Sequence, residues 1–161
     1  MTITQPSRQL QLVDVENLLG NPRPLEVEVR ECARLWCELV PTPCTSQAVI
    51  ACNHGAAEAV FWGWDQSARR LIRSGNNGAD EALMDVLRDE NIGTRFTQVV
   101  IGSGDGIFAD AAAWLATQGL DVTVVSRPNA LSRRLQLAAS RVIAFEQPDA
   151  VVPAAALGRA A

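Results

Sequence analysis

The chain has 161 residues, of which 48% are hydrophobic and 20% charged, so it is long and apolar enough for one globular domain with a buried core. Its formal net charge of -4 argues against a protein that holds nucleic acid by blanket neutralisation of phosphates. All fourteen basic residues are arginines, and the absence of lysine excludes the phosphate-loop lysine and the Schiff-base lysine from its chemistry.

Targeting and redox signals are sparse. No basic and then apolar leader opens the sequence, and no apolar run approaches the ~20 residues that a membrane helix needs. We therefore expect a cytoplasmic protein that does not enter a membrane. The four cysteines form no Cys-x-x-Cys pair, which favours reduced, packed thiols over a zinc site.

The first half of the chain alternates between strand and helix patterns. We expect residues 1–9 to be a flexible N-terminus. The apolar periodicity then predicts strands at residues 10–15, 46–52 and 68–73, and helices at residues 25–40 and 56–64. The first strand ends on Asp14 and Glu16, which lie on the same side of an extended chain because side chains in a strand alternate.

The second half repeats this alternation. It predicts helices at residues 79–90, 108–118 and 131–139, and strands at residues 96–101, 121–126 and 142–145. We expect residues 147–161 to be a loose tail. Alternating strands and helices predict a single doubly wound, three-layer α/β domain over residues 10–146, with a central and mainly parallel sheet of about five strands.

Three acids lie at the carboxyl ends of predicted strands. Asp14 closes the first strand, Asp80 opens the helix after the third, and Asp105 follows the fourth. In a doubly wound sheet this edge carries the functional crevice, at the point where the strand order reverses. If the first and fourth strands are neighbours there, the three carboxylates converge.

The turn around Asp105 contains Gly102, Gly104 and Gly106. We expect these glycines to let the backbone turn tightly and to leave little bulk beside the Asp105 carboxylate. A dinucleotide-binding interpretation of the same glycines is weaker, because the third glycine falls one residue short of that fingerprint and the motif follows the fourth strand.

Clustered carboxylates repel one another unless a cation compensates them, so this arrangement predicts a hard divalent ion with oxygen ligands. Mg²⁺ or Mn²⁺ is the natural candidate. The matching chemistry is phosphodiester hydrolysis, which needs neither a lysine nor a nucleophilic side chain when a metal activates water. We expect Asn17 to orient Asp14 or a metal-bound water, and Ser103 to orient Asp105.

Three short motifs resemble those of the NYN domains, a branch of the PIN-like ribonuclease fold. They are the strand end from Asp14 to Asn17, the segment Gly78-Ala79-Asp80 with Asp85, and Ser103-Gly104-Asp105. The similarity spans residues 10 to 127. It implies a PIN-like fold and an enzyme that holds a divalent metal with these acids and cuts RNA.

One position departs from the resemblance. The NYN motif usually continues Ser-Gly-Asp-Ser-Asp-Phe, whereas this chain has Ile107 in place of the second Asp. Asp110 is the candidate replacement ligand, provided that the following helix begins late enough to bring it round. The alternative is a weakened or inactive PIN-like module that binds RNA or regulates without cutting.

Outside the acids, three residues are candidates for substrate contacts. His54 follows the second predicted strand, while Arg73 and Arg127 end the third and follow the fifth. Each is a candidate for guiding a phosphate backbone toward the acids. We expect RNA, single-stranded or structured, as the partner. The sequence leaves open a homodimer, the choice of RNA and the choice between end and internal cleavage.

Overall fold

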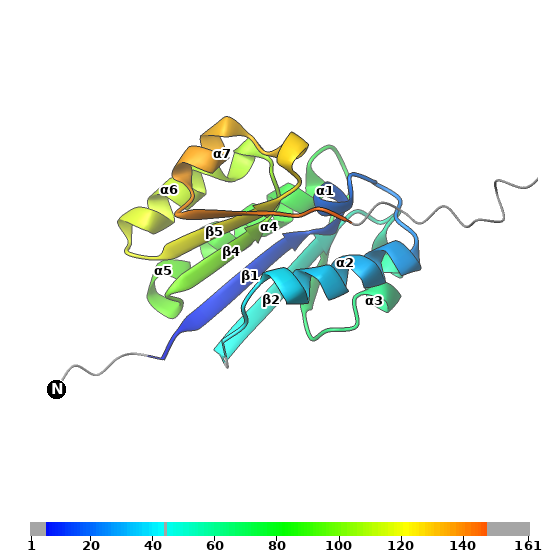
Figure 1. The fold of residues 1–161 in the computed structure, drawn as a ribbon, viewed down its shortest axis with the longest axis horizontal. Coiled ribbons are helices and arrows are strands. Elements are labelled where there is room, and N and C mark those ends of the chain that lie inside the picture. Colours follow the sequence, from blue (N-terminus) through cyan, green and yellow to red (C-terminus); the bar gives the residue numbers. More distant parts are fainter. Residues whose placement is uncertain (1–5, 44, 148–161) are drawn as a thin grey trace, which may run out of the picture.

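Six parallel strands form the central sheet, in the order β3-β2-β1-β4-β5-β6 (Figure 1). The computed structural model describes residues 6–43 and 45–147. The strands are β1 (Arg8–Asp14), β2 (Thr45–Cys52), β3 (Arg69–Ile72), β4 (Gln98–Gly102), β5 (Asp121–Ser126) and β6 (Arg141–Ala144). The predicted α/β class is confirmed, with six strands where about five were expected, because β6 pairs in parallel beside β5.

The ends of the domain differ from the prediction. Residues 1–5 of the expected flexible N-terminus, and residues 148–161 of the expected tail, lie outside the described residues. Within residues 1–9, Arg8 and Gln9 already belong to β1, where Arg8 pairs with Thr45 and Gln9 with Gln98. The first strand therefore begins two residues earlier than the apolar pattern indicates, because polar side chains are tolerated where neighbouring strands supply backbone partners.

Helices cover both faces of the sheet. They are α1 (Val15–Leu19), α2 (Glu26–Leu39), α3 (Ala57–Gly63), α4 (Gly78–Asp89), α5 (Ile92–Arg95), α6 (Ala109–Thr117) and α7 (Arg133–Ala138). The short helix α5 was not predicted; it starts where Asn91 adopts a left-handed conformation, with φ 52°, and redirects the chain after α4. None of the helices in the described part of the chain is long and apolar enough to cross a membrane.

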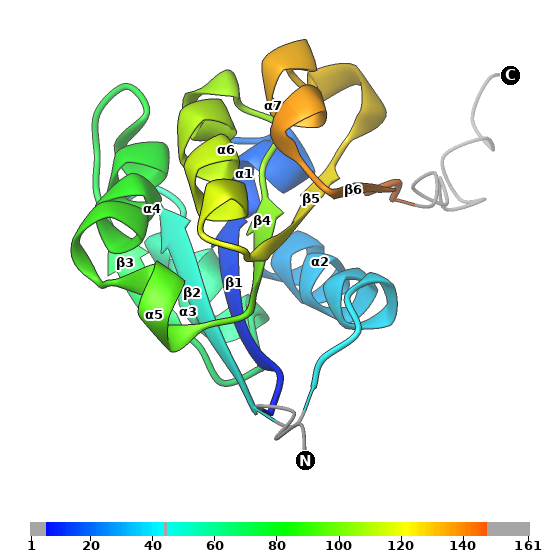
Figure 2. The same ribbon diagram turned by 90° about the vertical axis from the view of Figure 1, so that its left-hand side faces the viewer.

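Two hydrophobic clusters hold the layers together, one under the helices on each face of the sheet. The helices of the two faces are seen in Figure 2. Helices α4 to α7 contribute to one cluster, and α1 to α3 to the other. In β1, Leu12 packs into the first cluster and Val13 into the second, and both are fully buried. Strand β1 therefore contributes to the core on both faces of the sheet.

The strand order reverses between β1 and β4. From β1 the chain moves outward through β2 and β3, then returns to pair β4 against the other side of β1, with Val13 opposite Gly102. The loops after these two strands consequently diverge to opposite faces and leave a crevice between them. The adjacency of the first and fourth strands, on which the convergence of the three acids depends, is thus observed.

Candidate functional site

A pocket of about 330 Å³ lies at the carboxyl ends of β1 and β4. Its wall includes four carboxylates, Asp14, Glu16, Asp80 and Asp105. It also includes Asn17 and Arg127 of the predicted site, and the unpredicted Asn53 and Asn77. The three acids on which the sequence argument rests are therefore brought to one pocket by three separate loops.

Asp14 is fixed by the turn that follows it. The residue is 4% exposed and serves as the N-cap of α1, where its Oδ1 accepts a hydrogen bond of 3.0 Å from the backbone N–H of Asn17. Burial raises the pKa of the Asp14 carboxyl above its ordinary value, against a lowering contribution from its hydrogen bond with Asp80. A carboxylate this deep and this close to other acids carries charge at a cost.

Helix α1 begins directly after Asp14, which corrects the prediction for Glu16. The strand was expected to run to Val15, with Asp14 and Glu16 on one side of an extended chain. Instead, Val15 and Glu16 are the first residues of α1. The helical turn carries Glu16 toward β2, where its Oε1 accepts a hydrogen bond from the backbone N–H of Asn53.

The Asp105 loop is tied to the end of β1. Its carboxylate Oδ1 accepts a hydrogen bond of 2.9 Å from the backbone N–H of Ile107. The Ser103 hydroxyl accepts one of 3.2 Å from the backbone N–H of Asp105. The side chain of Asn17 reaches across and accepts a hydrogen bond of 3.0 Å from the N–H of Gly104. Asn17 therefore joins the β1 and β4 loops.

Close packing against another segment explains why two positions of this loop are glycines. A Cβ at Gly104 would lie 2.3 Å from the carbonyl oxygen of Ala130, and a Cβ at Gly106 would lie 2.9 Å from the Ser132 hydroxyl. Neither glycine has a positive φ. They are needed because the segment after β5 packs directly against the Asp105 loop, and not to clear space for a ligand.

Asp80 shows the strongest electrostatic perturbation in the pocket. It is 6% exposed and lies in the first turn of α4. Burial is the main cause that raises its pKa to about 8, followed by its hydrogen bond with Asp14 and by the charges of Asp14, Asp105 and Glu16. Its buried Oδ1 has no hydrogen-bond partner within the described residues. A buried oxygen acceptor without a donor is expensive in an apoprotein.

Arg127 supplies positive charge at the rim. Its Nε donates a hydrogen bond of 3.0 Å to the carbonyl oxygen of Asn17, and its guanidinium lies over Gly20 at the end of α1. A Cβ at Gly20 would come within 2.6 Å of that guanidinium, and the φ of 65° also favours glycine there. The structure thus holds Arg127 beside the acids.

Three predicted site residues lie elsewhere. Asp110 was expected to compensate for Ile107, but α6 begins at Ala109 and leaves Asp110 exposed, in an ion pair of 2.9 Å with Arg134. His54 is exposed and its Nδ1 contacts the Ser74 hydroxyl. None of these residues lines the pocket.

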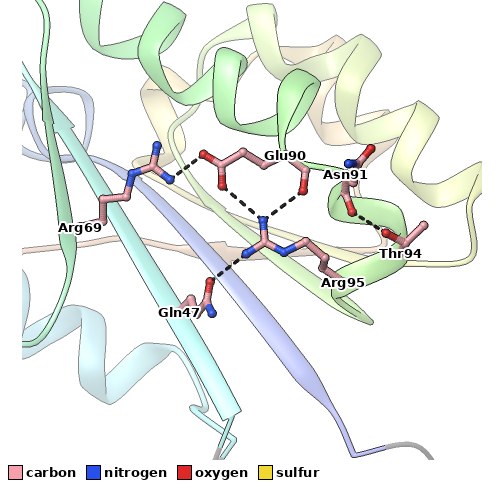
Figure 3. A network of polar contacts seen from close by, with 6 residues as sticks. All are labelled: Gln47, Arg69, Glu90, Asn91, Thr94 and Arg95. Atoms are coloured by element: carbon pink, nitrogen blue, oxygen red, sulfur yellow. Dashed lines mark hydrogen bonds and ion pairs between the residues drawn. The ribbon is translucent and has the colours of Figure 1, made fainter.

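Arg73 is the third, since it forms an ion pair of 2.8 Å with Asp85 on the outer side of α4. Asp85, the further acid of the Gly78-Ala79-Asp80 motif, is thus engaged with Arg73 and does not line the pocket. Neighbouring Arg69 is directed to the opposite end of the sheet, where it pairs with Glu90 (Figure 3). Arg69 and Arg73 are therefore both paired with acids that do not line the pocket.

Sequence reasoning missed Glu16 and Asn53 as members of this site. Glu16 was visible as an acid two residues after Asp14, but the strand period was applied across a point where the chain is already helical. Asn53 contributes through its backbone N–H, which carries no sequence signal. The Asn53 side chain has a role only within its own loop, where its oxygen accepts a hydrogen bond from the backbone N–H of Ala56.

The donor set suits a hard divalent cation. Four carboxylates offer oxygen ligands, and the unpartnered Oδ1 of Asp80 is a buried acceptor that a cation would satisfy. Within residues 6–43 and 45–147, no three His, Cys, Asp or Glu side chains already stand in an arrangement typical of a bound metal. The fit of these residues to a cation therefore rests on the chemistry and burial of the donor set.

The comparisons with known proteins support the fold alone. Models of protein families and the sequences of characterised proteins give no match to this chain. Among solved structures, a Vibrio parahaemolyticus protein of unknown function superposes with a TM-score of 0.63 at 16% sequence identity. The match covers 91% of this chain and 98% of the Vibrio protein. The chain therefore shares its overall fold with that protein.

Proposed function

We propose that the protein is a divalent-metal-dependent ribonuclease that hydrolyses RNA phosphodiester bonds at the pocket between the ends of β1 and β4. The observation that carries this proposal is Asp80, whose buried Oδ1 has no hydrogen-bond partner among the described residues while three further carboxylates line the same pocket. Such a cluster is unfavourable alone and becomes favourable when a cation is bound.

Each residue has a role that follows from its position. Asp14, Asp80 and Asp105 would hold the Mg²⁺ or Mn²⁺ ion, which when bound supplies a Lewis acid that activates water and offsets phosphate charge. The Arg127 guanidinium, held by the carbonyl of Asn17, is placed to bind a phosphate oxygen of the substrate. Asn17 and Ser103 keep the Asp105 loop in register with β1.

RNA is proposed as the substrate for two reasons. The order and spacing of the three acidic motifs resemble those of NYN domains, which cut RNA. The pocket is also polar and opens at the sheet edge, where Arg127 stands beside the carboxylates. A long phosphodiester chain can cross such an edge while presenting one phosphate to the acids.

A second candidate is a module that binds RNA without cutting it. It is favoured by Ile107, which replaces an acid of the motif, and by the ion pair that holds Asp110 at Arg134. Both features leave the segment after Asp105 with fewer acids near the pocket than the resemblance implies. Cleavage and binding therefore have to be measured separately.

The test is cleavage of an end-labelled single-stranded RNA in Mg²⁺ or Mn²⁺, with and without EDTA. We expect metal-dependent cleavage by the wild type and none by Asp105→Asn, whose amide oxygen can still accept the Ile107 hydrogen bond. Asp121→Asn is the matched control, because Asp121 is exposed at the amino end of β5.

Cleavage that persists in Asp105→Asn, or that survives EDTA, would contradict the proposed mechanism. Metal-independent RNA binding without cleavage by the wild type would favour the second candidate.

A further inference from the structure

Position 107 holds an isoleucine where the NYN motif has its second acid. Ile107 is 38% exposed and does not line the pocket, and Asp110 is engaged with Arg134. The segment after Asp105 therefore supplies no further carboxylate. A fourth carboxylate nevertheless lines the pocket, and it comes from the other side of the site, on α1.

Glu16 reaches the pocket because of two structural features. Helix α1 begins directly after the Asp14 cap, so Glu16 turns toward the neighbouring strand β2. The backbone N–H of Asn53, the first residue after β2, then donates a hydrogen bond to Glu16 Oε1. The carboxylate is thus held over the end of β2, while Asp14 ends β1 and Asp105 follows β4.

The charge of Glu16 is not explained by this hydrogen bond alone. An amide oxygen of glutamine would accept the Asn53 N–H equally well, without adding a negative charge near Asp14 and Asp80. Like charges in a half-buried cluster destabilise the fold unless something offsets them. The buried Oδ1 of Asp80, which has no hydrogen-bond partner among the described residues, is an independent observation in the same pocket, because a cation would satisfy this acceptor.

We propose that Glu16 is the fourth carboxylate of the candidate metal site and that it replaces, from the opposite side of the pocket, the acid that residue 107 lacks. The inference rests on the proposed function, because it assumes that the pocket binds a divalent cation. It adds that Glu16 makes up for the carboxylate absent at position 107, so the negative charge around that cation is not reduced.

The test is Mn²⁺ binding, measured by isothermal titration calorimetry and by the loss of the free-Mn²⁺ signal in electron paramagnetic resonance. We expect Glu16→Gln to weaken Mn²⁺ binding about tenfold, since one of four ligand charges is lost while the Asn53 hydrogen bond is kept. Glu58→Gln, an exposed change of equal charge on α3, is expected to bind Mn²⁺ as the wild type does.

The outcomes separate the two proposals. Wild-type binding together with unaltered binding by Glu16→Gln overturns the role of Glu16 and leaves the proposed function standing. Failure of the wild type to bind Mn²⁺ overturns both. Unfolding temperatures measured without metal show that weakened binding does not come from loss of the fold, because Glu16→Gln removes a repulsive charge and should be at least as stable as the wild type.

Discussion

The two ends of the sheet differ in how their charges are balanced. At the amino end, a pocket of about 610 Å³ is lined by Arg69, Glu90 and Arg95. These side chains are engaged with one another, since Glu90 pairs with both arginines and Arg95 also contacts Gln47 (Figure 3). At the carboxyl end, a pocket of about 330 Å³ collects four carboxylates and one arginine.

The difference shows that unbalanced charge is a better guide to this site than pocket size. At the amino end, each charged group of the network has an opposite partner, so the arrangement is stable without any ligand. At the carboxyl end, burial is the main cause that raises the pKa of Asp80 to about 8, and the neighbouring acids add to this increase. The smaller pocket is therefore the one for which we propose a cation.

The largest expected effect comes from Asp14, the most central of the carboxylates. We expect Asp14→Asn to lower the rate of RNA cleavage at least about 100-fold, because a charged ligand is lost while the amide oxygen can still cap α1. Initial rates on labelled RNA at saturating Mn²⁺ measure this. A loss smaller than about tenfold would show that the acidic end does not carry the reaction.

Arg127 is expected to act on substrate binding. Arg127→Gln should raise KM for RNA about tenfold with a smaller change in kcat, because the guanidinium at the pocket rim is proposed to bind a phosphate. Steady-state kinetics at several salt concentrations measure the split. The control is Arg133→Gln, at an exposed position on α7. Equal effects of the two changes would mean that only general positive charge matters.

The raised pKa of Asp80 predicts how stability without metal depends on pH. The folded state holds the proton more tightly than the unfolded state, so this contribution is complete below the ordinary pKa of 3.8 and is lost as pH rises through about 8. The pKa values of Asp14 and Glu16 are shifted in the same direction, mainly by burial. Metal-free protein should therefore unfold at a lower temperature at pH 8 than at pH 5.5.

We expect a difference of about 1 kcal/mol, or roughly 2–4 °C, in thermal unfolding followed by circular dichroism in EDTA. Asp80→Asn should reduce this dependence, and added Mn²⁺ should raise the unfolding temperature of the wild type most at pH 8. A wild-type unfolding temperature that rises between pH 5.5 and pH 8 in EDTA would contradict the assigned shift.

Much of the fold could be predicted because the apolar patterns are clear. Strand β5 was predicted over its observed residues, Asp121–Ser126, since Gly119 ends the preceding helix and a valine-rich run follows. The expected β1–β4 adjacency at the reversal of strand order follows from general rules of doubly wound sheets. By the same rules, residues that follow β1 and β4, such as Asp14 and Asp105, are expected at one crevice.

The parts that were missed depend on local geometry that residue types do not reveal. Glu16 was placed by strand periodicity, whereas the Asp14 cap starts a helix one residue earlier. Asp110 was considered as a ligand, but the position at which α6 begins turns it outward to Arg134. The packing of Gly104 against Ala130 depends on a contact between distant segments, which a single sequence does not display.

The smallest expected effect is at the amino end, at Glu90. Partial burial works to raise the pKa of Glu90, but the hydrogen bonds and charges of Arg69 and Arg95 outweigh it and lower the pKa below its ordinary value. Such a carboxylate stabilises the fold above its unfolded-state pKa, and the contribution is lost as pH falls through the lowered folded-state value. Because all three side chains are partly exposed, Glu90→Gln should cost only about 0.5 kcal/mol at pH 7.

This small change is the sharpest check on the comparison between the two ends. Thermal unfolding of Glu90→Gln should show a decrease of about 1–2 °C at pH 7 that disappears at about pH 3, whereas Glu58→Gln should show neither. RNA cleavage and Mn²⁺ affinity should both stay at wild-type values, because the amino-end network lines a separate pocket from the acids. An equal loss of Mn²⁺ affinity in Glu90→Gln and Glu16→Gln would mean that metal binding depends on charge throughout the domain. That result would contradict the assignment of the metal site to the carboxyl-end pocket.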